Sequence, residues 1–300
     1  MQKAIIALVA IILIGIGAYW YFQSSQTATN DALVPPTDNT TQEATTTAQE
    51  QQNKDQAVVS KSVEGRDITA YHFGTGDKEI LFVGGIHGGY EWNTALVAYE
   101  LMDYLKANPT AIPANVKVTV IPVLNPDGLK KVVSVEGKFV AADVNPSTEV
   151  QVTGRFNGNT VDLNRNFDCD WKATGVWQNK KVSGGSAAFS EPESAAIKSY
   201  VESAKPAAVV AYYSSAGGVY ASNCHGDLMP ETKSLTAAYA KASGYPGHDV
   251  WNYYETTGDM TNWLAKMDIP AISVLLTNHT DTEWSKNQAG VDAILKHFAQ

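Results

Sequence analysis

Short apolar runs and helically spaced apolar residues alternate along most of the chain. Glu79 to Val83 and Val116 to Val123 are apolar runs that predict buried strands. Between them, apolar residues recur at helical spacing from Glu91 to Ala107, which predicts an amphipathic helix. Val58 to Phe73 predicts a hairpin. The folded region is therefore expected to begin with a hairpin, a strand, a helix and a further strand.

The second half of the chain continues this alternation. Ser190 and Glu193 have the spacing of a capping box, which predicts a helix that runs to Ala204. The apolar run from Ala208 to Tyr213 predicts a buried strand. The pattern predicts three more helices and one more strand, at residues 231–243, 259–266, 283–298 and 271–277.

Strands that alternate with helices indicate the α/β class. We expect a mixed, largely parallel sheet flanked by helices on both faces. Ligands of such folds bind in loops beyond the carboxyl ends of the strands. His87, Tyr213 and Leu275 are all expected at or near such ends. The sequence therefore places any site at this edge of the sheet.

The N-terminal segment from Ala4 to Phe22 is apolar and carries no charge. Its length approaches the roughly 20 residues that a helix needs to cross a bilayer. Lys3 precedes it and the next basic residue is Lys54, so the positive-inside tendency places the N-terminus in the cytoplasm. A cleaved signal peptide is the alternative, but no small-x-small cleavage site follows. We expect a single-pass anchor at residues 1–22, which would hold the rest of the chain outside the cell membrane.

The segment from residue 23 to 57 is rich in Gln, Thr, Ser, Ala and Asn. It has almost no bulky apolar side chain to offset the entropy of ordering, which predicts a disordered linker. Residues 58–300 then form the folded domain. With 44% apolar residues, the chain is long enough for one sizeable core.

The charge of the chain excludes one class of partner. The net charge is −9, and no cluster of Lys or Arg is present. Nucleic-acid binding requires basic patches that contact phosphates, so no nucleic-acid partner is expected.

The chain contains two cysteines, Cys169 and Cys224. In an exported chain such a pair predicts one disulfide. Two unconnected buried thiols remain open as an alternative. A metal-binding thiol pair is disfavoured because there is no CxxC spacing.

Two clusters carry candidate chemistry. His87 follows an expected strand and is flanked by glycines, and Glu91 starts the next helix, so imidazole and carboxylate could face one zinc ion. In the second cluster, Asn164 and Arg165 offer an amide and a guanidinium fork that suit a terminal carboxylate, with Arg155 upstream. The alternative for Arg165 is a surface ion pair with a neighbouring aspartate.

The runs Gly-Gly-Ile-His87-Gly-Gly-Tyr-Glu91 and Asp162-Leu-Asn-Arg-Asn-Phe167 together resemble the zinc carboxypeptidases of the carboxypeptidase A type. The resemblance extends over the whole folded domain. It implies one zinc ion bound by His87 and Glu91, and a substrate carboxylate held by Asn164 and Arg165. It also implies that Arg155 stabilises the oxyanion. Tyr254 would be the mobile active-site tyrosine, with its neighbour Tyr253 as the alternative.

The chain departs from the family pattern at three places. The zinc motif reads H-x-x-x-E instead of H-x-x-E. Tyr213, or Ser214 if the register slips by one, lies where the family has a third zinc-binding His. His225 and His279 are possible substitutes from loops. Leu275 lies where the family has its catalytic Glu.

These observations lead to two functional hypotheses. The first is a membrane-tethered zinc metallocarboxypeptidase, a hydrolase with impaired activity that acts on the C-terminal residues of peptides or cell-wall stem peptides. His279 would then be the substitute base. The second is a catalytically inactive relative, a pseudoenzyme, that binds carboxylate-ended peptides. The first is expected to contain one zinc ion per chain.

Overall fold

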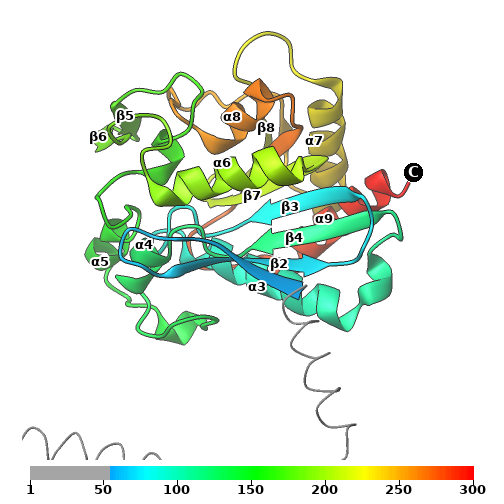
Figure 1. Cartoon of the computed structure of the whole chain (residues 1–300), viewed down its shortest axis with the longest axis horizontal. Coiled ribbons are helices and arrows are strands. Elements are labelled where there is room, and N and C mark those ends of the chain that lie inside the picture. The colour runs from blue at the N-terminus through cyan, green and yellow to red at the C-terminus, as the bar shows by residue number, and fades with distance from the viewer. Residues whose placement is uncertain (1–54) are drawn as a thin grey trace, which may run out of the picture. The chain divides into compact units, whose positions relative to one another are not determined.

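The structure, a computed structural model, describes residues 55–300. An eight-stranded sheet forms the centre of this part, with helices on both faces (Figure 1). The α/β class with a mixed, mostly parallel sheet is therefore confirmed. The expected anchor at residues 1–22 and nearly all of the expected linker lie outside the described residues. Within residues 55–300, every helix is too short or too polar to span a bilayer.

The sheet has the order β1-β2-β4-β3-β7-β10-β8-β9. Its middle consists of four parallel strands, β4, β3, β7 and β10, and the flanking pairs β1–β2, β2–β4 and β10–β8 are antiparallel. The strands are β1 (Gln56–Lys61), β2 (Asp67–Phe73), β3 (Lys78–Val83), β4 (Val116–Ile121), β7 (Ala208–Ser214), β8 (Gly218–Ala221), β9 (Gly247–His248) and β10 (Ala271–Leu276).

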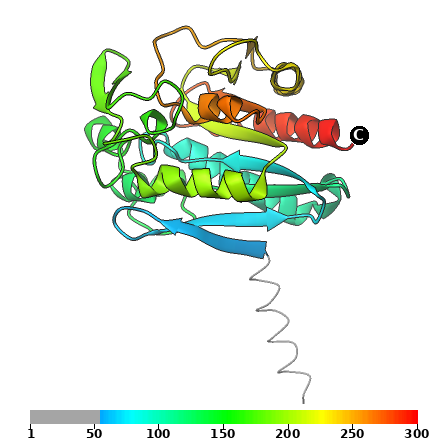
Figure 2. The ribbon, with the colours of Figure 1, turned by 45° about the horizontal axis from the view of Figure 1, so that its top comes forward.

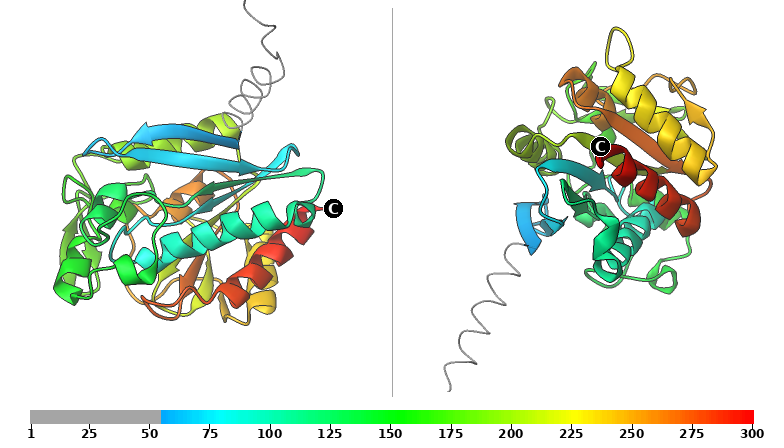
Figure 3. Two further views of the ribbon diagram at one scale, coloured as in Figure 1. Left: turned by 90° about the horizontal axis from the view of Figure 1, so that it is seen from below. Right: turned by 90° about the vertical axis from the view of Figure 1, so that its right-hand side faces the viewer.

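The longer helices divide between the two faces of the sheet. The main helices are α3 (Trp92–Ala107), α6 (Pro192–Ala204), α7 (Pro230–Ser243), α8 (Met260–Lys266) and α9 (Trp284–Phe298). Figure 3 shows α3 and α9 side by side on one face, and Figure 2 shows α6 in front of the strands on the other face.

Successive side chains of the central strands point to opposite faces of the sheet, so each face has its own core and its own helices. In β3, Ile80 and Phe82 pack into one apolar core with residues of α3, α7 and α9. Leu81 and Val83 point the opposite way into a second core with residues of α6 and α8. Because successive side chains of a strand point to opposite faces, a strand buried on both faces is apolar throughout.

The boundaries of most predicted elements agree with the structure to within one or two residues, but the predicted capping box is wrong. Ser190 does not cap α6, which starts at Pro192 with Glu191 at the N-cap. A proline has a fixed φ and no N–H, so it favours the first helical position. The carboxylate of Glu193 instead accepts hydrogen bonds from Val63 N and Asn157 Nδ2.

Some elements were not predicted from the sequence. They are the hairpin of β5 (Thr174–Trp177) and β6 (Lys180–Ser183), the strands β8 and β9, and the short helices α4 (Pro126–Lys130) and α5 (Thr148–Thr153). The β1 strand also starts two residues before the expected domain boundary.

Candidate functional site

Three neighbouring parallel strands bring the candidate residues together. β7 lies between β3 and β10, so the loops after these three strands meet at one edge of the sheet. His87 follows β3, and Tyr213 of β7 pairs in register with Leu275 of β10. A pocket opens at this edge, as expected for such a fold.

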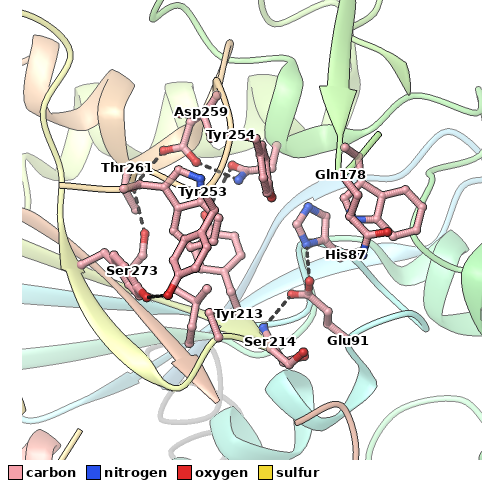
Figure 4. Close-up of a pocket in the computed structure, with 18 of the residues that line it drawn as sticks. His87, Glu91, Gln178, Tyr213, Ser214, Tyr253, Tyr254, Asp259, Thr261 and Ser273 are labelled. Carbon is pink, nitrogen blue, oxygen red and sulfur yellow. Dashed lines mark hydrogen bonds and ion pairs between the residues drawn. The ribbon is translucent and has the colours of Figure 1, made fainter. Parts of the chain in front are cut away.

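Nearly all the residues singled out from the sequence line this pocket, which Figure 4 shows in close-up. They are His87, Glu91, Arg155, Asn164, Arg165, Tyr213, Ser214, Tyr253, Tyr254, Leu275 and His279. His225 is not among them, because it is exposed and lies 3.1 Å from Asp170 in a surface ion pair.

The glycines after His87 accommodate the longer spacing of the zinc motif. Gly88 has a φ of +45°, which favours glycine, and a Cβ there would lie 2.6 Å from the carbonyl oxygen of Gly154. The tight turn brings His87 Nδ1 to 2.9 Å from Glu91 Oε1. Figure 4 shows Glu91 between His87 and Ser214, whose backbone N–H donates to Glu91 Oε2 at 3.1 Å.

Asp162 connects His87 to Arg155. One carboxylate oxygen lies 3.4 Å from His87 Nε2, and the other accepts a hydrogen bond from Arg155 Nε at 2.9 Å. All three side chains are buried. A carboxylate behind a histidine is also the arrangement found for metal-binding histidines. The pairing also shows that Asp162 neutralises Arg155 and not Arg165.

Burial and charge oppose each other at the two carboxylates. Burial alone would raise the pKa of Glu91, but the nearby His87 and Arg155 outweigh it and lower this pKa. At Asp162 burial is likewise outweighed by Arg155 and His87, and the pKa is strongly lowered. Both groups are therefore carboxylates at neutral pH.

The Arg155 guanidinium lies between aromatic rings at the pocket wall. Its Cζ is 4.5 Å from the centre of the Trp177 ring and 5.7 Å from that of Tyr90. Nη1 lies 3.7 Å from Glu91 Oε1, which is too long for a hydrogen bond. The pocket thus contains a buried cation held in place by stacking and by one hydrogen bond to Asp162.

Arg165 is buried and is not a surface arginine. Its Nε and Nη2 donate to the carbonyl oxygen of Val176, and Nη1 donates to the carbonyl oxygen of Asn164. A guanidinium has five N–H groups, so one hydrogen remains on each terminal nitrogen. Two hydrogens on neighbouring nitrogens suit bidentate binding of a carboxylate.

The Asn164 amide is part of the pocket wall. Oδ1 accepts from Met260 N at 3.0 Å and from the Tyr213 hydroxyl at 3.3 Å, and Nδ2 donates to Asp259 at 2.8 Å. One N–H of the amide therefore remains for a ligand.

Tyr213 is a neutral phenol. Its burial, together with the negative charges of Asp259 and Glu91, raises its pKa well above the usual value. The hydroxyl keeps its proton and donates it to Asn164. Tyr213 is therefore a poor metal ligand, because a tyrosine binds metal as the anion. Leu275, in register beside it, cannot transfer a proton.

These donors do not fit a catalytic zinc site. Such a site takes three protein ligands, typically His, Cys, Asp or Glu. Neither ring nitrogen of His87 has a hydrogen-bond partner of acceptable geometry. His87 and Glu91 therefore provide two side chains that face each other and could bind a metal ion. Within residues 55–300, no three side chains of these types are arranged to hold a metal ion. His87 and Glu91 alone therefore do not complete a catalytic zinc site.

The two candidates for the mobile active-site tyrosine lie in different environments. Tyr254 is mostly buried, and its ring centre lies 5.9 Å from Arg165 Cζ. Tyr253 is 62% exposed and its hydroxyl lies 3.3 Å from that of Tyr220. The structure therefore places Tyr254, and not its neighbour, beside the arginine.

Sequence reasoning missed three groups of the pocket. Asp259 is a buried carboxylate that caps helix α8 and also accepts from Thr261. Trp177 belongs to the β5 strand that was not predicted, and Ser215 follows β7. An Asp directly before a helical segment is a capping signal, and it could have identified Asp259.

The cysteines form the expected bond. Cys169 and Cys224 are joined in a disulfide, and the residues between them include β5 to β8. The bond ties the segment after Arg165 to the loop after β8.

Comparisons with known proteins point to one family. A family model described as zinc carboxypeptidase matches residues 41–287. The catalytic chain of human carboxypeptidase N is 29% identical over 185 residues, 57% of this chain and 37% of that protein. The gamma-D-glutamyl-L-diamino acid endopeptidase 1 of Lysinibacillus sphaericus is 25% identical over 210 residues, 62% of this chain and 52% of that protein.

The fold is shared with solved structures of low sequence identity. Murein-tripeptide amidase from Escherichia coli O157 superposes with a TM-score of 0.54 and 17% identity, covering 81% of this chain and 91% of that one. The chain spans about half or less of the curated relatives it matches. From its pocket, its sheet and the extent of the family match, the chain belongs to the zinc carboxypeptidase family.

Proposed function

We propose that this domain binds the C-terminal carboxylate of peptides and hydrolyses the adjoining bond slowly. The observation that carries the proposal is the pair Arg155 and Arg165 in one pocket, beside the amide of Asn164. Asp162 pairs with Arg155, whereas the hydrogen bonds of Arg165 go to backbone carbonyl oxygens. A carboxylate bound by two parallel N–H groups gains both energy and a fixed orientation.

The roles of the two arginines differ in the proposed complex. Arg165, with one hydrogen left on each terminal nitrogen, would bind the terminal carboxylate together with Asn164. Arg155 would face the carbonyl oxygen of the terminal peptide bond, where negative charge develops during hydrolysis. The Tyr254 ring lies beside Arg165 and would close on the C-terminal residue of the bound peptide.

The proposed slow rate follows from two side chains. Tyr213 keeps its proton where a third zinc ligand is expected, and Leu275 occupies the expected place of the proton-transferring carboxylate. General acid–base catalysis typically accelerates a reaction by about 10²–10⁴-fold, so its loss is costly. The same two residues favour the second candidate, a domain that binds carboxylate-ended peptides without hydrolysis.

Cell-wall stem peptides are the proposed substrate class. Two of the similar proteins carry names that refer to murein tripeptide and to a gamma-D-glutamyl-diamino acid bond. An extracytoplasmic domain on a membrane anchor would meet such peptides. The pocket also contains the buried carboxylate of Asp259, which suits a terminal residue with an amino group.

Binding is tested by calorimetry with paired peptides. Each peptide is used in two forms, with a free C-terminal carboxylate and with a C-terminal amide. The comparison therefore needs no variant of the protein. A charge-assisted hydrogen bond contributes about 1.5–3 kcal/mol, so amidation should weaken binding roughly 10- to 100-fold. Equal affinity for both forms would exclude carboxylate recognition.

Hydrolysis and zinc content are measured on the same preparation. Slow release of the terminal residue supports the enzyme, and tight binding with no release supports the binding domain. The two-donor set predicts substoichiometric zinc after dialysis. One tightly held zinc ion per chain would show that the donor set is complete and that the proposed impairment is wrong.

We also propose that residues 1–22 anchor the protein in the cell membrane with the folded domain outside. The apolar segment from Ala4 to Phe22 and its charge asymmetry support this location. The full chain should remain in the membrane fraction after a carbonate wash, and a chain without residues 1–22 should not. A shortened, released protein would instead indicate a cleaved signal peptide.

A further inference from the structure

A histidine and two serines meet at the pocket wall where β7 and β10 end. His279 Nδ1 lies 2.8 Å from Ser214 Oγ, and Nε2 lies 3.4 Å from Ser215 Oγ. Ser214 is buried and Ser215 is exposed, and all three residues line the pocket. Neither serine hydroxyl has a role in the proposed binding of a carboxylate.

The hydrogen-bond network fixes which nitrogen of His279 carries the proton. Asn93 Nδ2 donates to the carbonyl oxygens of Asn278 and Asp281, at 2.8 and 3.0 Å. The amide oxygen of Asn93 therefore faces Ser214 Oγ, at 3.2 Å, and only accepts. The single hydroxyl hydrogen of Ser214 goes to Asn93.

Ser214 Oγ must then accept from His279, so the proton of the neutral ring is on Nδ1. The lone pair of Nε2 is left facing Ser215 Oγ. A separation of 3.4 Å is long for a hydrogen bond, but nucleophile–base contacts are often looser before a substrate binds. The arrangement thus points a proton acceptor at an exposed hydroxyl.

The loop that carries this histidine is held by its own side chains. Asn278 Oδ1 accepts three hydrogen bonds of 2.8 Å from Thr280 and Asp281. Glu283 accepts two more from Thr277, at 2.7 and 2.9 Å. A catalytic group needs such support, because small displacements of the reacting atoms reduce the rate strongly.

The charges around His279 favour the neutral ring in the resting protein. Burial lowers its pKa, and the cation Arg155 and the ring of His87 act in the same direction. The Glu91 carboxylate opposes them and would stabilise the imidazolium once it forms. The ring also packs against Tyr90, with 4.6 Å between the ring centres.

We propose that Ser215 and His279 form a nucleophile–base pair that cleaves acyl bonds in this pocket without a metal ion. The Oγ–H proton of Ser215 passes to His279 Nε2 as Oγ bonds to the carbonyl carbon. The bond to the leaving amine then breaks, and the amine takes the proton from Nε2. Water, deprotonated by the same nitrogen, hydrolyses the ester on Ser215 and regenerates the hydroxyl.

In this reaction Arg155 provides positive charge for the carbonyl oxygen, and Ser214 and Asn93 are positioning residues that fix the ring. The inference depends on the proposed function only for the class of substrate that enters the pocket. The Ser215–His279 pair would account for slow hydrolysis in a site that offers only two zinc ligands, His87 and Glu91.

The test is covalent labelling of the full chain with a fluorophosphonate probe in the presence of a zinc chelator. Peptide mass mapping should locate the label on Ser215. Ser215→Ala should abolish labelling, and His279→Gln should slow it by about 10²-fold or more. Ser203→Ala and His225→Gln are matched controls, because both residues are exposed and neither lines the pocket.

A second measurement examines the positioning residues. The labelling rate should fall in acid as His279 gains a proton. Ser214→Ala, which removes the fixed tautomer, should lower the rate and change this pH profile, which a merely structural role would not do. An unchanged profile with Ser214→Ala would overturn the positioning role of Ser214.

No label on the wild-type protein, or a label that persists in Ser215→Ala, would overturn the pair. Labelling at the wild-type rate in His279→Gln would overturn the role of the histidine. Peptide binding by the wild-type protein is measured separately. Binding without labelling would therefore refute the pair alone, and labelling without discrimination between free and amidated peptides would refute the proposed carboxylate recognition alone.

Discussion

At the scale of single residues, Tyr213 and Leu275 differ in kind from groups that bind zinc or transfer protons. The phenol is neutral, because burial and two nearby carboxylates raise its pKa. The leucine side chain has no titratable group and lies beside it across the β7–β10 pairing. Changing both residues should therefore alter metal binding and catalysis together.

The double substitution Tyr213→His and Leu275→Glu is expected to tighten zinc binding and raise the rate of peptide hydrolysis. The new imidazole would complete a set of three donors with His87 and Glu91. The new carboxylate would add proton transfer, typically worth about 10²–10⁴-fold. Zinc titration and release of the C-terminal residue measure the two effects. Tyr253→His is the matched control, and no gain in either measurement would contradict our placement of the site.

Asp162→Asn should lower the free energy of unfolding at neutral pH. The substitution leaves Arg155 buried without its main counter-charge, and breaking a buried pair typically costs about 3–5 kcal/mol. Denaturant unfolding measures this difference. Asp249→Asn, an exposed carboxylate 3.6 Å from Lys233, is the control and should change stability by less than about 1 kcal/mol.

The difference between wild type and Asp162→Asn should shrink in acid. The folded-state pKa of Asp162 is lowered, so its stabilisation is fully present above the usual carboxyl pKa of about 4. As the pH falls below that value, the wild type loses the contribution progressively. A difference that stays constant from pH 7 to pH 3 would show that the carboxylate charge is not responsible.

Single residues also limited what the sequence could predict. His87, Glu91, Asn164 and Arg165 stood out because their neighbours form distinctive motifs. The partner of Asp162 could not be predicted, because the sequence does not show which of two nearby arginines a carboxylate contacts. The tautomer of the loop histidine likewise depends on contacts with residues far away in the chain.

At the scale of elements, the predicted strands and helices were those with long periodic apolar patterns. The capping box failed because the helix starts at Pro192, one residue later than a cap at Ser190 would place it. The β5 and β6 strands have only four residues each, which is too short for an apolar pattern to stand out in the sequence. Short pairings of this kind are fixed by the neighbouring structure and not by their own sequence.

One side chain, Asp259, both caps helix α8 and contacts the pocket residue Asn164. Asp259 accepts a hydrogen bond from Asn262 N at 2.9 Å and one from Asn164 Nδ2 at 2.8 Å. Asp259→Ala should cost about 1 kcal/mol for the lost cap, and more if the Asn164 amide is left unpaired. A lower denaturant midpoint with an unchanged slope is the expected result. Asp259→Asn retains a capping oxygen and should restore much of the loss, and equal loss in both variants would contradict the capping role.

At the scale of the whole molecule, the alternation of strands and helices was sufficient to predict the fold class. It was not sufficient to predict the strand order, in which β7 lies between β3 and β10. That order is what brings His87, Tyr213 and Leu275 to one cavity from separate parts of the chain. Strand order depends on long-range packing, so the motifs alone suggested a shared site without showing its walls.

The disulfide should contribute to global stability. Cys169 and Cys224 are separated by 55 positions, and closing a loop of this size stabilises by about 4 kcal/mol in the chain-entropy model. Cys169→Ser with Cys224→Ser should lower the unfolding free energy by about this amount, measured without reductant. Adding reductant should destabilise the wild type but not the double variant. Equal sensitivity of both proteins would show that the bond is not the cause.

The same bond determines how the protein should be produced for study. The cytosol of an expression host keeps thiols reduced. Protein purified from it would lack the disulfide that links the segment after Arg165 to the loop after β8. Weak peptide affinity in such a sample would reflect its redox history and not its pocket. Secretion into an oxidising compartment, or refolding with a thiol–disulfide buffer, gives the form whose ligand affinities can be interpreted.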